Sequence, residues 1–274
     1  MAEERDYLLG THDAEVRRLG HQHRVWRSRV LDAWRRAGVR TGSVVIDAGA
    51  GPGWASLDLA EIVGEDGRVV ALERSQRFSD IMMSTARQRG LDGIIQPHVL
   101  DLVEDDIPAS GVDAVWVRWV LAFVSNPARV VGKLAQALRP GGTAVMHEYL
   151  HYESLAVLPD DGCIDAFVRR VMEDWRASGG EPNVGRDLPR LLLENDMRIV
   201  EMRPLVDVAR PGSLIWEWPA LWMRNYPGHL VAAGKVPPDW AERIPAALAA
   251  AEADPAAVMI TPTVLEIVAE KRGL

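Results

Sequence analysis

Three glycines at alternate positions offer the clearest chemistry in this sequence. Gly49, Gly51 and Gly53 follow the apolar run at residues 44–46, and helix-forming residues come directly after them. Glycine lets the backbone approach a ligand closely and adopt φ values that other residues avoid. The first turn of the following helix offers unpaired N–H groups. The spacing therefore predicts a ligand-binding turn at the end of a buried strand.

Two cofactor classes use a glycine-rich turn of this kind. A dinucleotide enzyme needs G-x-G-x-x-G. Gly49 and Gly51 fit that pattern, but Trp54 occupies the last position, where it would block close packing against a pyrophosphate. The spacing in this chain is instead D-x-G-x-G-x-G, beginning at Asp47. The turn therefore leaves two alternatives. The protein is an NAD(P)-dependent dehydrogenase, or it uses the other cofactor class, whose motif has this second spacing.

Strands and helices alternate around the turn. Apolar runs typical of buried parallel strands are expected at residues 44–46, 68–72, 94–100, 112–117 and 143–146. Helices are expected at 54–63, 75–90 and 127–138. Residues 139–142, Arg-Pro-Gly-Gly, should break the chain before the fifth strand. This alternation predicts an α/β, Rossmann-like, doubly wound sheet with helices on both faces.

The rest of the chain lacks this alternation. A long amphipathic helix is expected at 13–37, with Asp13 able to cap its start. After residue 150, helices are expected at 161–178, 187–195, 213–233 and 239–251, and strand-like segments at 197–208 and 258–269. We therefore expect a helical lid at 1–40 and a cofactor-binding core at 41–150. Residues 151–274 should supply cap helices, inserted after strands five and six, and the last strands of a seven-stranded, mostly parallel sheet.

Composition excludes several classes of protein. The chain has 274 residues, of which 48% are hydrophobic, a net charge of -8 and a single cysteine, Cys163. A largely disordered chain and a disulfide scaffold are excluded. No apolar run reaches about 18 residues, and the first thirty residues are too charged for a secretory signal, so a cytoplasmic protein without a membrane partner is expected. The negative net charge argues against a nucleic-acid partner, which would require a basic surface. No His or Cys cluster has metal-ligand spacing, so no metal is expected.

The glycine motif resembles that of class I S-adenosylmethionine-dependent methyltransferases. The resemblance continues in order over roughly residues 40–150: Glu73 ends the second strand, residues 98–102 (His-Val-Leu-Asp-Leu) resemble the end of the third, and residues 138–142 match the turn before the fifth. Within the class, the arrangement resembles the small-molecule branch that includes the ubiquinone/menaquinone-biosynthesis methyltransferases. Residues 118–121 (Arg-Trp-Val-Leu) lack the (D/N)-P-P-(Y/F) signature of nucleic-acid amino methylation.

The resemblance implies S-adenosylmethionine as cofactor and a role for each acidic residue. In the family, the residue at Glu73 accepts hydrogen bonds from both ribose hydroxyls, and the residue at Asp101 accepts from the adenine amino group. The residue at Asp47 orients the amino end of the methionine part, usually through water. Cofactor contacts are accordingly expected from Gln22, Asp47, Ala48, Gly49, Gly51, Gly53, Glu73, Arg74, Asp101, Leu102 and Arg118.

His147 and Glu148 are the expected catalytic residues. Methyl transfer is an in-line displacement at a sulfonium carbon, so the nucleophile must be aligned and water excluded. An O–H or N–H nucleophile also loses a proton to a base, whereas an alkene acceptor would become a carbocation that aromatic faces stabilise. Both residues leave the fifth strand beside the expected methyl group, and one of the two should face the cleft because neighbours on a strand alternate. Each could act as base or substrate ligand, or could only hydrogen-bond a loop.

Substrate contacts are expected from His23, Trp119, Trp218 and Trp222. His23 lies on the apolar face of the 13–37 helix, so it is either a core histidine or, if that helix covers the cofactor, a ligand contact. Trp218 and Trp222 share a helix face and line a substrate pocket, pack the cap or form a homodimer interface.

Tryptophan usage gives an expectation for the acceptor. Seven of the ten tryptophans lie outside residues 41–150. We expect a small, at least partly apolar or aromatic acceptor enclosed by the cap, methylated on O, N or C. A cofactor-binding domain kept for regulation, without catalytic activity, is the non-enzyme alternative.

Overall fold

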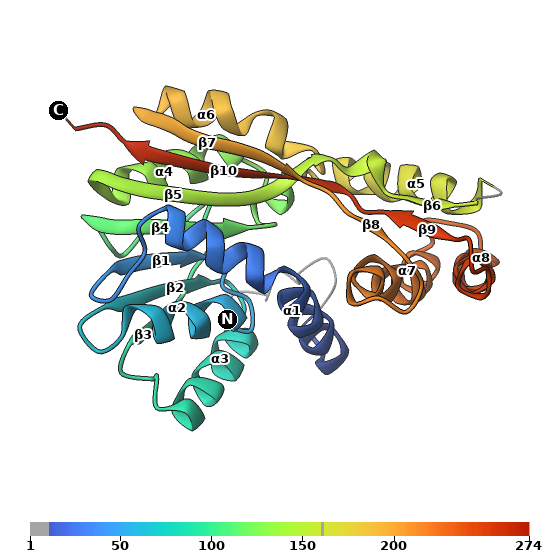
Figure 1. Ribbon diagram of the computed structural model, residues 1–274, viewed down its shortest axis with the longest axis horizontal. Coiled ribbons are helices and arrows are strands. Elements are labelled where there is room, and N and C mark those ends of the chain that lie inside the picture. The colour runs from blue at the N-terminus through green and yellow to red at the C-terminus, as the bar shows by residue number, and fades with distance from the viewer. Residues whose placement is uncertain (1–10, 160–161, 274) are drawn as a thin grey trace.

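A seven-stranded sheet forms the centre of the structure (Figure 1), a computed structural model that describes residues 11–159 and 162–273. Its strand order is β3-β2-β1-β4-β5-β10-β7. β10 is antiparallel to both of its neighbours, and the other pairs are parallel. This confirms the expected doubly wound, mostly parallel sheet. The strands are β1 (Val44–Ala48), β2 (Arg68–Glu73), β3 (Ile95–Val99), β4 (Val112–Arg118), β5 (Leu138–His151), β7 (Met197–Leu205) and β10 (Thr263–Lys271).

Helices cover both faces of this sheet. Figure 1 shows α1, α2 and α3 on one side and α4 and α6 on the other. They span α1 (Asp13–Arg36), α2 (Trp54–Val63), α3 (Gln76–Arg89), α4 (Pro127–Ala137) and α6 (Leu188–Glu194). Because both faces are covered, β1 and β4 are buried along most of their length, as their apolar composition requires.

The cap is built on an extension of the outer strands. β6 (Ala156–Leu158), β8 (Val208–Ala209) and β9 (Val258–Ile260) form a second sheet in the order β6-β9-β8. In sequence, β6 follows β5, β8 follows β7, and β9 precedes β10. The helices of the cap are connected to these strands in sequence: α5 (Cys163–Ala177) follows β6, α7 (Leu214–Ala232) follows β8, and α8 (Trp240–Ala253) precedes β9. The strands β5, β10 and β7 therefore connect the main sheet to the cap. The cap extends to one side of the main sheet in Figure 1.

Several predicted boundaries are wrong. Residues 139–142 do not break the chain: β5 runs through them, with a register irregularity against β4 and a φ of 75° at Gly141. The start of α1 is capped by His12, whose ring accepts from the backbone N–H of Glu15, and not by Asp13. The predicted strand at 258–269 is two strands, β9 and β10. The predicted helix at 161–178 begins at 163, and residue 161 lies outside the described residues.

Short 3-10 turns connect the sheet to its flanking segments. They are η1 (Leu121–Phe123), η2 (Tyr152–Ser154) and η3 (Val184–Arg186). η1 follows β4, and η2 connects β5 to β6. These two turns therefore lie where the main sheet meets the cap.

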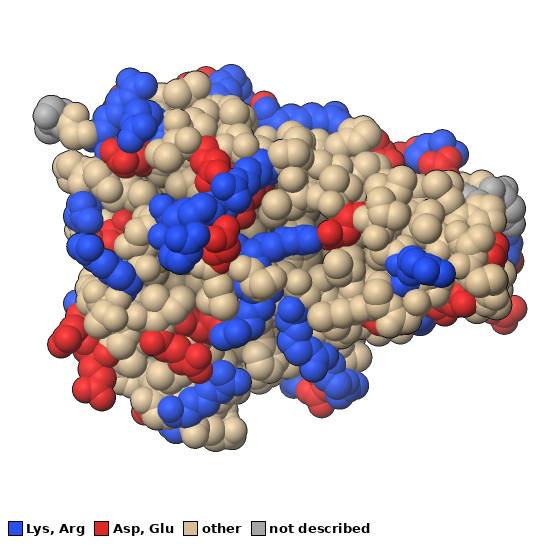
Figure 2. Space-filling model, viewed as in Figure 1, with Lys and Arg blue, Asp and Glu red and all other residues tan. Residues whose placement is uncertain are grey.

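Both signs of charge lie interspersed on the face drawn in Figure 2, which includes α1. Among the residues that the structure describes, no helix combines the length and apolar character needed to cross a bilayer. Within the same residues, no group of three or more His, Cys, Asp or Glu side chains is placed to hold a metal ion.

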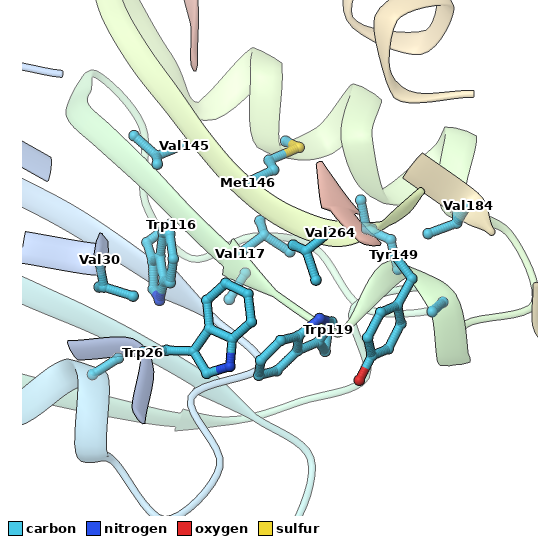
Figure 3. Close-up of a cluster of buried hydrophobic side chains, with 14 of the residues drawn as sticks. Trp26, Val30, Trp116, Val117, Trp119, Val145, Met146, Tyr149, Val184 and Val264 are labelled. Atoms are coloured by element: carbon cyan, nitrogen blue, oxygen red, sulfur yellow. The ribbon is translucent and has the colours of Figure 1, made fainter. Parts of the chain in front are cut away.

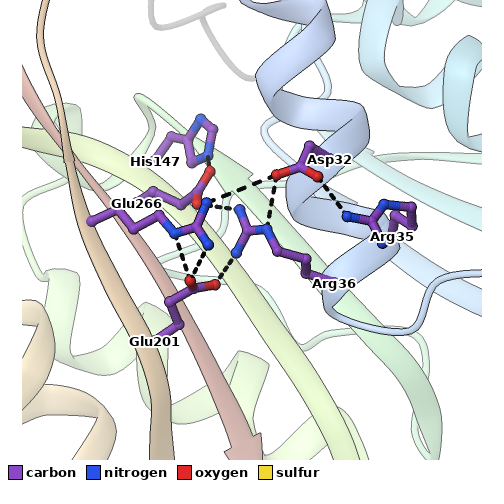
Figure 4. A network of polar contacts seen from close by, with 7 residues as sticks. Asp32, Arg35, Arg36, His147, Glu201 and Glu266 are labelled. Atoms are coloured by element: carbon purple, nitrogen blue, oxygen red, sulfur yellow. Dashed lines mark hydrogen bonds and ion pairs between the residues drawn. The ribbon is translucent and has the colours of Figure 1, made fainter.

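A partly buried ion network joins α1 to β5, β7 and β10 (Figure 4). The Arg36 guanidinium, at the end of α1, pairs with Glu201 on β7 and Glu266 on β10. Its Nε donates to Asp32 on α1 at 2.8 Å. Glu266 is 2% exposed, and its other oxygen lies 3.0 Å from Nε2 of His147 on β5. The last turn of α1 is thus joined to three strands.

Replacing Arg36 by Ala should destabilise the protein by about 3 kcal/mol, because a buried carboxylate that loses its cationic partner keeps its desolvation penalty. Arg35→Ala, at the preceding residue, is the matched control. The Arg35 side chain is 74% exposed, and its pair with Asp32 is a surface pair. Urea unfolding of both variants measures the difference. Equal effects of the two substitutions would show that this network contributes nothing.

Candidate active site

A cleft of about 300 Å³ opens at the carboxyl ends of β1, β2 and β4. Its walls come from the glycine turn, the ends of these strands, the loop after β3, and α1. Nine of the eleven residues expected to contact a cofactor line it: Gln22, Asp47, Gly49, Gly51, Glu73, Arg74, Asp101, Leu102 and Arg118. Ala48 and Gly53 are not among the lining residues. The fold therefore gathers these nine residues in one cavity although they are up to 96 positions apart in sequence.

The glycines of the turn serve different purposes. A Cβ at Gly49 would lie 2.3 Å from Cγ2 of Val120, and one at Gly53 would lie 2.2 Å from Cγ of Met82. Both residues also have positive φ, 72° and 86°. Gly53 is therefore required by packing against α3 and by the start of α2, and not by a ligand in the cleft. A Cβ at Gly51 would meet nothing within 4 Å, so Gly51 offers open backbone to the cleft.

Glu73 connects the glycine turn to the end of β2. One carboxylate oxygen accepts the backbone N–H of Gly51 and the other accepts that of Ser75, both at 2.8 Å. Burial raises the pKa of Glu73, and the two N–H donors oppose that rise. The carboxylate is thus held in place while it still lines the cleft. Its remaining lone pairs can accept from hydroxyl groups of a ligand.

Two further carboxylates extend this acidic wall. Asp47 accepts the hydroxyl of Ser56 at 2.6 Å, and burial raises its pKa to about 6, although Ser56 and the positive charge of Arg118 oppose the rise. Asp101 uses Oδ1 to accept the backbone N–H of Val103 at 2.8 Å. That bond fixes the loop after β3, and the side chain remains at the cleft wall.

Arg118 brings a positive charge to the same cleft from the end of β4. Its Nη2 lies 3.2 Å from Nδ1 of His23, and its Nη1 is buried without a hydrogen-bond partner among the described residues. Burial lowers the pKa of Arg118 to about 10, so the group stays charged at neutral pH. A half-buried cation that lines the cleft and has a spare N–H donor is suited to a ligand carboxylate.

A second cavity of about 70 Å³ adjoins the first and is aromatic. The two cavities share Gln22, Trp119 and Phe123 in their walls. The rings that line the smaller cavity are Trp119, Phe123, Tyr149, Tyr152, Trp175, Trp218, Trp222 and Tyr226. They come from the end of β4, η1, the end of β5, η2, α5 and α7. The smaller cavity thus lies between the sheet edge and the cap.

Ring stacking holds this wall together. Trp119 stacks on Trp218 with ring centroids 5.4 Å apart and on Tyr149 at 5.5 Å. Figure 3 shows Trp26, Trp119 and Tyr149 in one row. Trp119 has a φ of 50°, which is rare for a large side chain, and such strain is found mostly where a site requires it. Trp222 stacks on Tyr226 at 5.6 Å. Both Trp218 and Trp222, predicted from their helical spacing, line the cavity.

His147 and Glu148 line neither cavity, contrary to the expectation that one of them faces the cleft. His147 is fully buried against Glu266 and the rings of Trp116 and Trp26. Oε1 of Glu148 accepts the backbone N–H groups of residues 120 and 121, each at 2.8 Å. Glu148 thus matches the alternative in which one of these residues hydrogen-bonds a loop, whereas His147 pairs with Glu266 on β10.

His23 also lies outside both cavities, so it is not placed to touch a substrate. Tyr149, Tyr152 and Trp175 line the smaller cavity although the sequence analysis did not select them as site residues. Their only signal in the sequence is an aromatic residue within a few positions of an expected element boundary, which is too common to identify a site.

The proteins to which this chain is similar in sequence include methyltransferases. Residues 46–146 match the family described as "Methyltransferase domain". The chain is 28% identical over 216 residues to an uncharacterized 37.1 kDa protein in transposon TN4556 of Streptomyces fradiae, covering 78% of this chain and 59% of that protein. It is 30% identical over 132 residues to a demethylmenaquinone methyltransferase of Oceanobacillus iheyensis, covering 46% of this chain and 52% of that one.

Solved structures share the fold at low sequence identity. A geranyl diphosphate methyltransferase in complex with SAM has a TM-score of 0.59 at 16% identity, covering 94% of this chain and 90% of that chain. The [4+2]-cyclase SpnF has a TM-score of 0.56 at 18% identity, covering 89% and 81%. Proteins described by different reactions therefore share this architecture, and the chain spans only about half to three fifths of the relatives it matches in sequence.

The pKa of Glu148 generates a pH prediction. Burial raises the pKa of this carboxyl from 4.5 to about 7, because the backbone N–H donors of residues 120–122 only partly offset desolvation. The unfolded chain therefore loses this proton at lower pH than the folded protein, so the contribution of Glu148 to stability falls as pH rises from about 4.5 past 7. Glu148→Gln mimics the protonated form. The stability of the variant relative to the natural protein should rise by about 3 kcal/mol between pH 4.5 and 8.

Urea unfolding at several pH values measures this difference. Asp47 titrates in the same range in both proteins, so its effect cancels in the comparison. A difference between the two proteins that does not change with pH would show that Glu148 is ionised throughout.

Proposed function

We propose that this protein, whose residues 46–146 match the methyltransferase domain family, is a class I S-adenosylmethionine-dependent methyltransferase that binds its cofactor in the larger cavity and methylates a small acceptor in the smaller one. The observation that carries the proposal is the pair of adjoining cavities with different chemistry. The larger has carboxylates and a guanidinium at the strand ends, and the smaller is lined by eight aromatic rings. Such a pair suits a polar cofactor beside an apolar acceptor.

The polar groups of the larger cavity fit the parts of this cofactor. Glu73 would accept from the ribose hydroxyls, and Asp101 from the adenine amino group. Asp47 would face the amino group of the methionine part, and Arg118 its carboxylate, because the unpartnered Nη1 supplies the donor that a carboxylate needs. Trp54 lines the cleft and also packs under α1, where a Cβ at Gly20 would lie 3.1 Å from its ring. That packing disfavours a pyrophosphate there and so the dehydrogenase alternative.

The bound cofactor supplies an electrophilic methyl group on a sulfonium. The protein's part is to hold the acceptor in line and to exclude water. Gln22, Trp119 and Phe123 lie where the two cavities meet, so these residues would align the acceptor with the methyl group. His147 and Glu148 are too deeply buried to accept a proton from the acceptor directly. We propose instead that they support the site without touching the acceptor. Glu148 accepts hydrogen bonds from the turn directly after Trp119 and so holds that residue in position.

The smaller cavity points to the kind of acceptor. Its walls favour a flat or apolar molecule that packs against indole and phenol rings. The hydroxyls of Tyr149, Tyr152 and Tyr226 offer hydrogen bonds to a polar substituent. Arg18 also lines this cavity, but its guanidinium is already paired with Glu15 at 2.7 Å. We therefore propose a small, uncharged, partly aromatic acceptor enclosed by α1 and the cap, methylated on O, N or C.

Removing the Glu73 carboxylate tests the cofactor assignment. Glu73→Ala should weaken binding of S-adenosylhomocysteine at least about tenfold, because hydrogen bonds to a charged acceptor are lost. Glu61→Ala is the control, since that glutamate is exposed on α2 and lies outside both cavities. Titration calorimetry measures both variants and also NAD(P). Binding of the dinucleotide alone would contradict the proposed function, and an unchanged affinity in Glu73→Ala would contradict the role of this residue.

Truncating Trp222 tests the acceptor cavity. With radiolabelled cofactor and a panel of small aromatic metabolites, Trp222→Ala should lower methyl transfer by about tenfold or more while the affinity for S-adenosylhomocysteine stays the same. Trp240→Ala is the matched control, because this half-buried cap tryptophan lines neither cavity. Label that enters folded protein or RNA with no small acceptor present would rule out an enclosed acceptor. Persistent silence across the panel would favour a non-catalytic regulatory domain.

A further inference from the structure

We propose that His23 of the lid helix is a positioning residue that holds the Arg118 guanidinium in place for the cofactor's carboxylate. The inference rests on the proposed cofactor and goes beyond it, because it assigns a second task to α1. The helix would not only cover the cleft but would also hold the group that binds one end of the ligand. Binding of the carboxylate and docking of α1 would then favour each other.

The geometry around His23 fixes its tautomer. Nε2 lies 3.0 Å from Oδ2 of Asp58, and Nδ1 lies 3.2 Å from Nη2 of Arg118. A guanidinium only donates hydrogen bonds, so Nδ1 must be the acceptor. The proton of the neutral ring is therefore on Nε2, where it donates to Asp58. His23 lies on α1, Asp58 on α2 and Arg118 on β4. The His23 ring therefore connects the lid helix to one helix and one strand of the core.

Arg118 depends on this contact for its orientation. In the described part of the chain, the His23 ring is its hydrogen-bond partner, and the guanidinium otherwise lies near the rings of Trp116 and Trp119, with Cζ 5.8 and 5.4 Å from their centroids. Ring faces restrain a cation without fixing the direction of its N–H groups. The bond from Nη2 to His23 sets that direction and leaves Nη1 for the ligand.

The electrostatics keep His23 in the accepting form. Burial lowers its pKa, and the charges of Arg118 and Arg27 act in the same direction, while Asp58 opposes them. Asp58 is shared, because it also accepts from Nε of Arg27 at 2.7 Å. At neutral pH the ring is therefore uncharged. Protonation of Nδ1 in acid would place an N–H against the guanidinium and remove the bond.

Two ligands separate positioning from simple packing. S-adenosylhomocysteine carries the carboxylate, whereas 5′-methylthioadenosine keeps the adenine, ribose and sulfur but lacks the amino-acid part. His23→Leu should weaken binding of S-adenosylhomocysteine at least about tenfold, since an oriented charge-assisted contact is lost. It should leave the affinity for methylthioadenosine within about twofold. His21→Leu, on the same helix and outside both cavities, is the control for a general loss of α1 docking.

A conservative variant tests the direction of the bond. Asn places an oxygen near the position of Nδ1, so His23→Asn should recover most of the affinity for S-adenosylhomocysteine. It should also remove the His23 contribution to the pH dependence. The affinity of the natural protein should fall as pH drops through the lowered pKa of His23, and that of the Asn variant should fall less. Asp47 titrates in both proteins, so the comparison between them isolates His23.

Calorimetry with these ligands decides the proposal. A loss of affinity for methylthioadenosine equal to that for S-adenosylhomocysteine in His23→Leu would overturn it, because the residue would then be only structural. Unchanged binding of both ligands in that variant would overturn it as well. Neither result touches the proposed function, which instead fails if the natural protein binds no S-adenosylhomocysteine at all.

Discussion

The parallel register of β1 with its two neighbours is the constraint on which the candidate site depends. Ala48, at the end of β1, pairs with Leu72 on β2 and with Val117 on β4. The next residues of those strands, Glu73 and Arg118, therefore reach the same edge as the glycine turn. A register shift of one residue would turn each side chain toward the opposite face. The opposite charges at this edge are thus placed by backbone hydrogen bonds along the whole strands, and not by contact with each other.

The cap adds a different kind of surface to that edge. The ends of β4 and β5 supply Trp119 and Tyr149, and the cap helices α5 and α7 supply the rings that face them. One wall of the aromatic cavity is therefore as rigid as the sheet, whereas the other is carried by the cap. Gln22 on α1 connects these parts, because its side-chain oxygen accepts from both Arg18 and the indole of Trp218.

The parts of the site that could be predicted from the sequence are those fixed by local chemistry. A strand followed by D-x-G-x-G-x-G, with Glu73 at the end of β2 and Asp101 just after β3, identifies the larger cavity because each residue lies where its own strand stops. The expectation for His147 and Glu148 rested on alternation along β5. In a sheet covered by helices on both faces, alternation sends both side chains into packed interior, and neither into the cleft. The aromatic cavity depends on contacts among distant elements, which no local pattern encodes.

The outer strands continue without a flexible linker from the main sheet into the cap sheet. β5 reaches β6 through η2, and only Thr261 and Pro262 separate β9 from β10. Hydrogen bonds also join these connections to one another: the backbone N–H of Thr261 donates to the carbonyl of Asp207, and that of Thr263 donates to the hydroxyl of Ser154. A cap connected in this way resists pivoting against the core, because pivoting would break these bonds. Exchange of small molecules at the aromatic cavity then depends on the least anchored cover. For α1 that is the end farthest from Arg36, because the bonds of Arg77 to Asp13 and to the carbonyl of Thr11 at the start of the helix are solvent-exposed. Opening of this one helix end would then be enough to uncover the cavity.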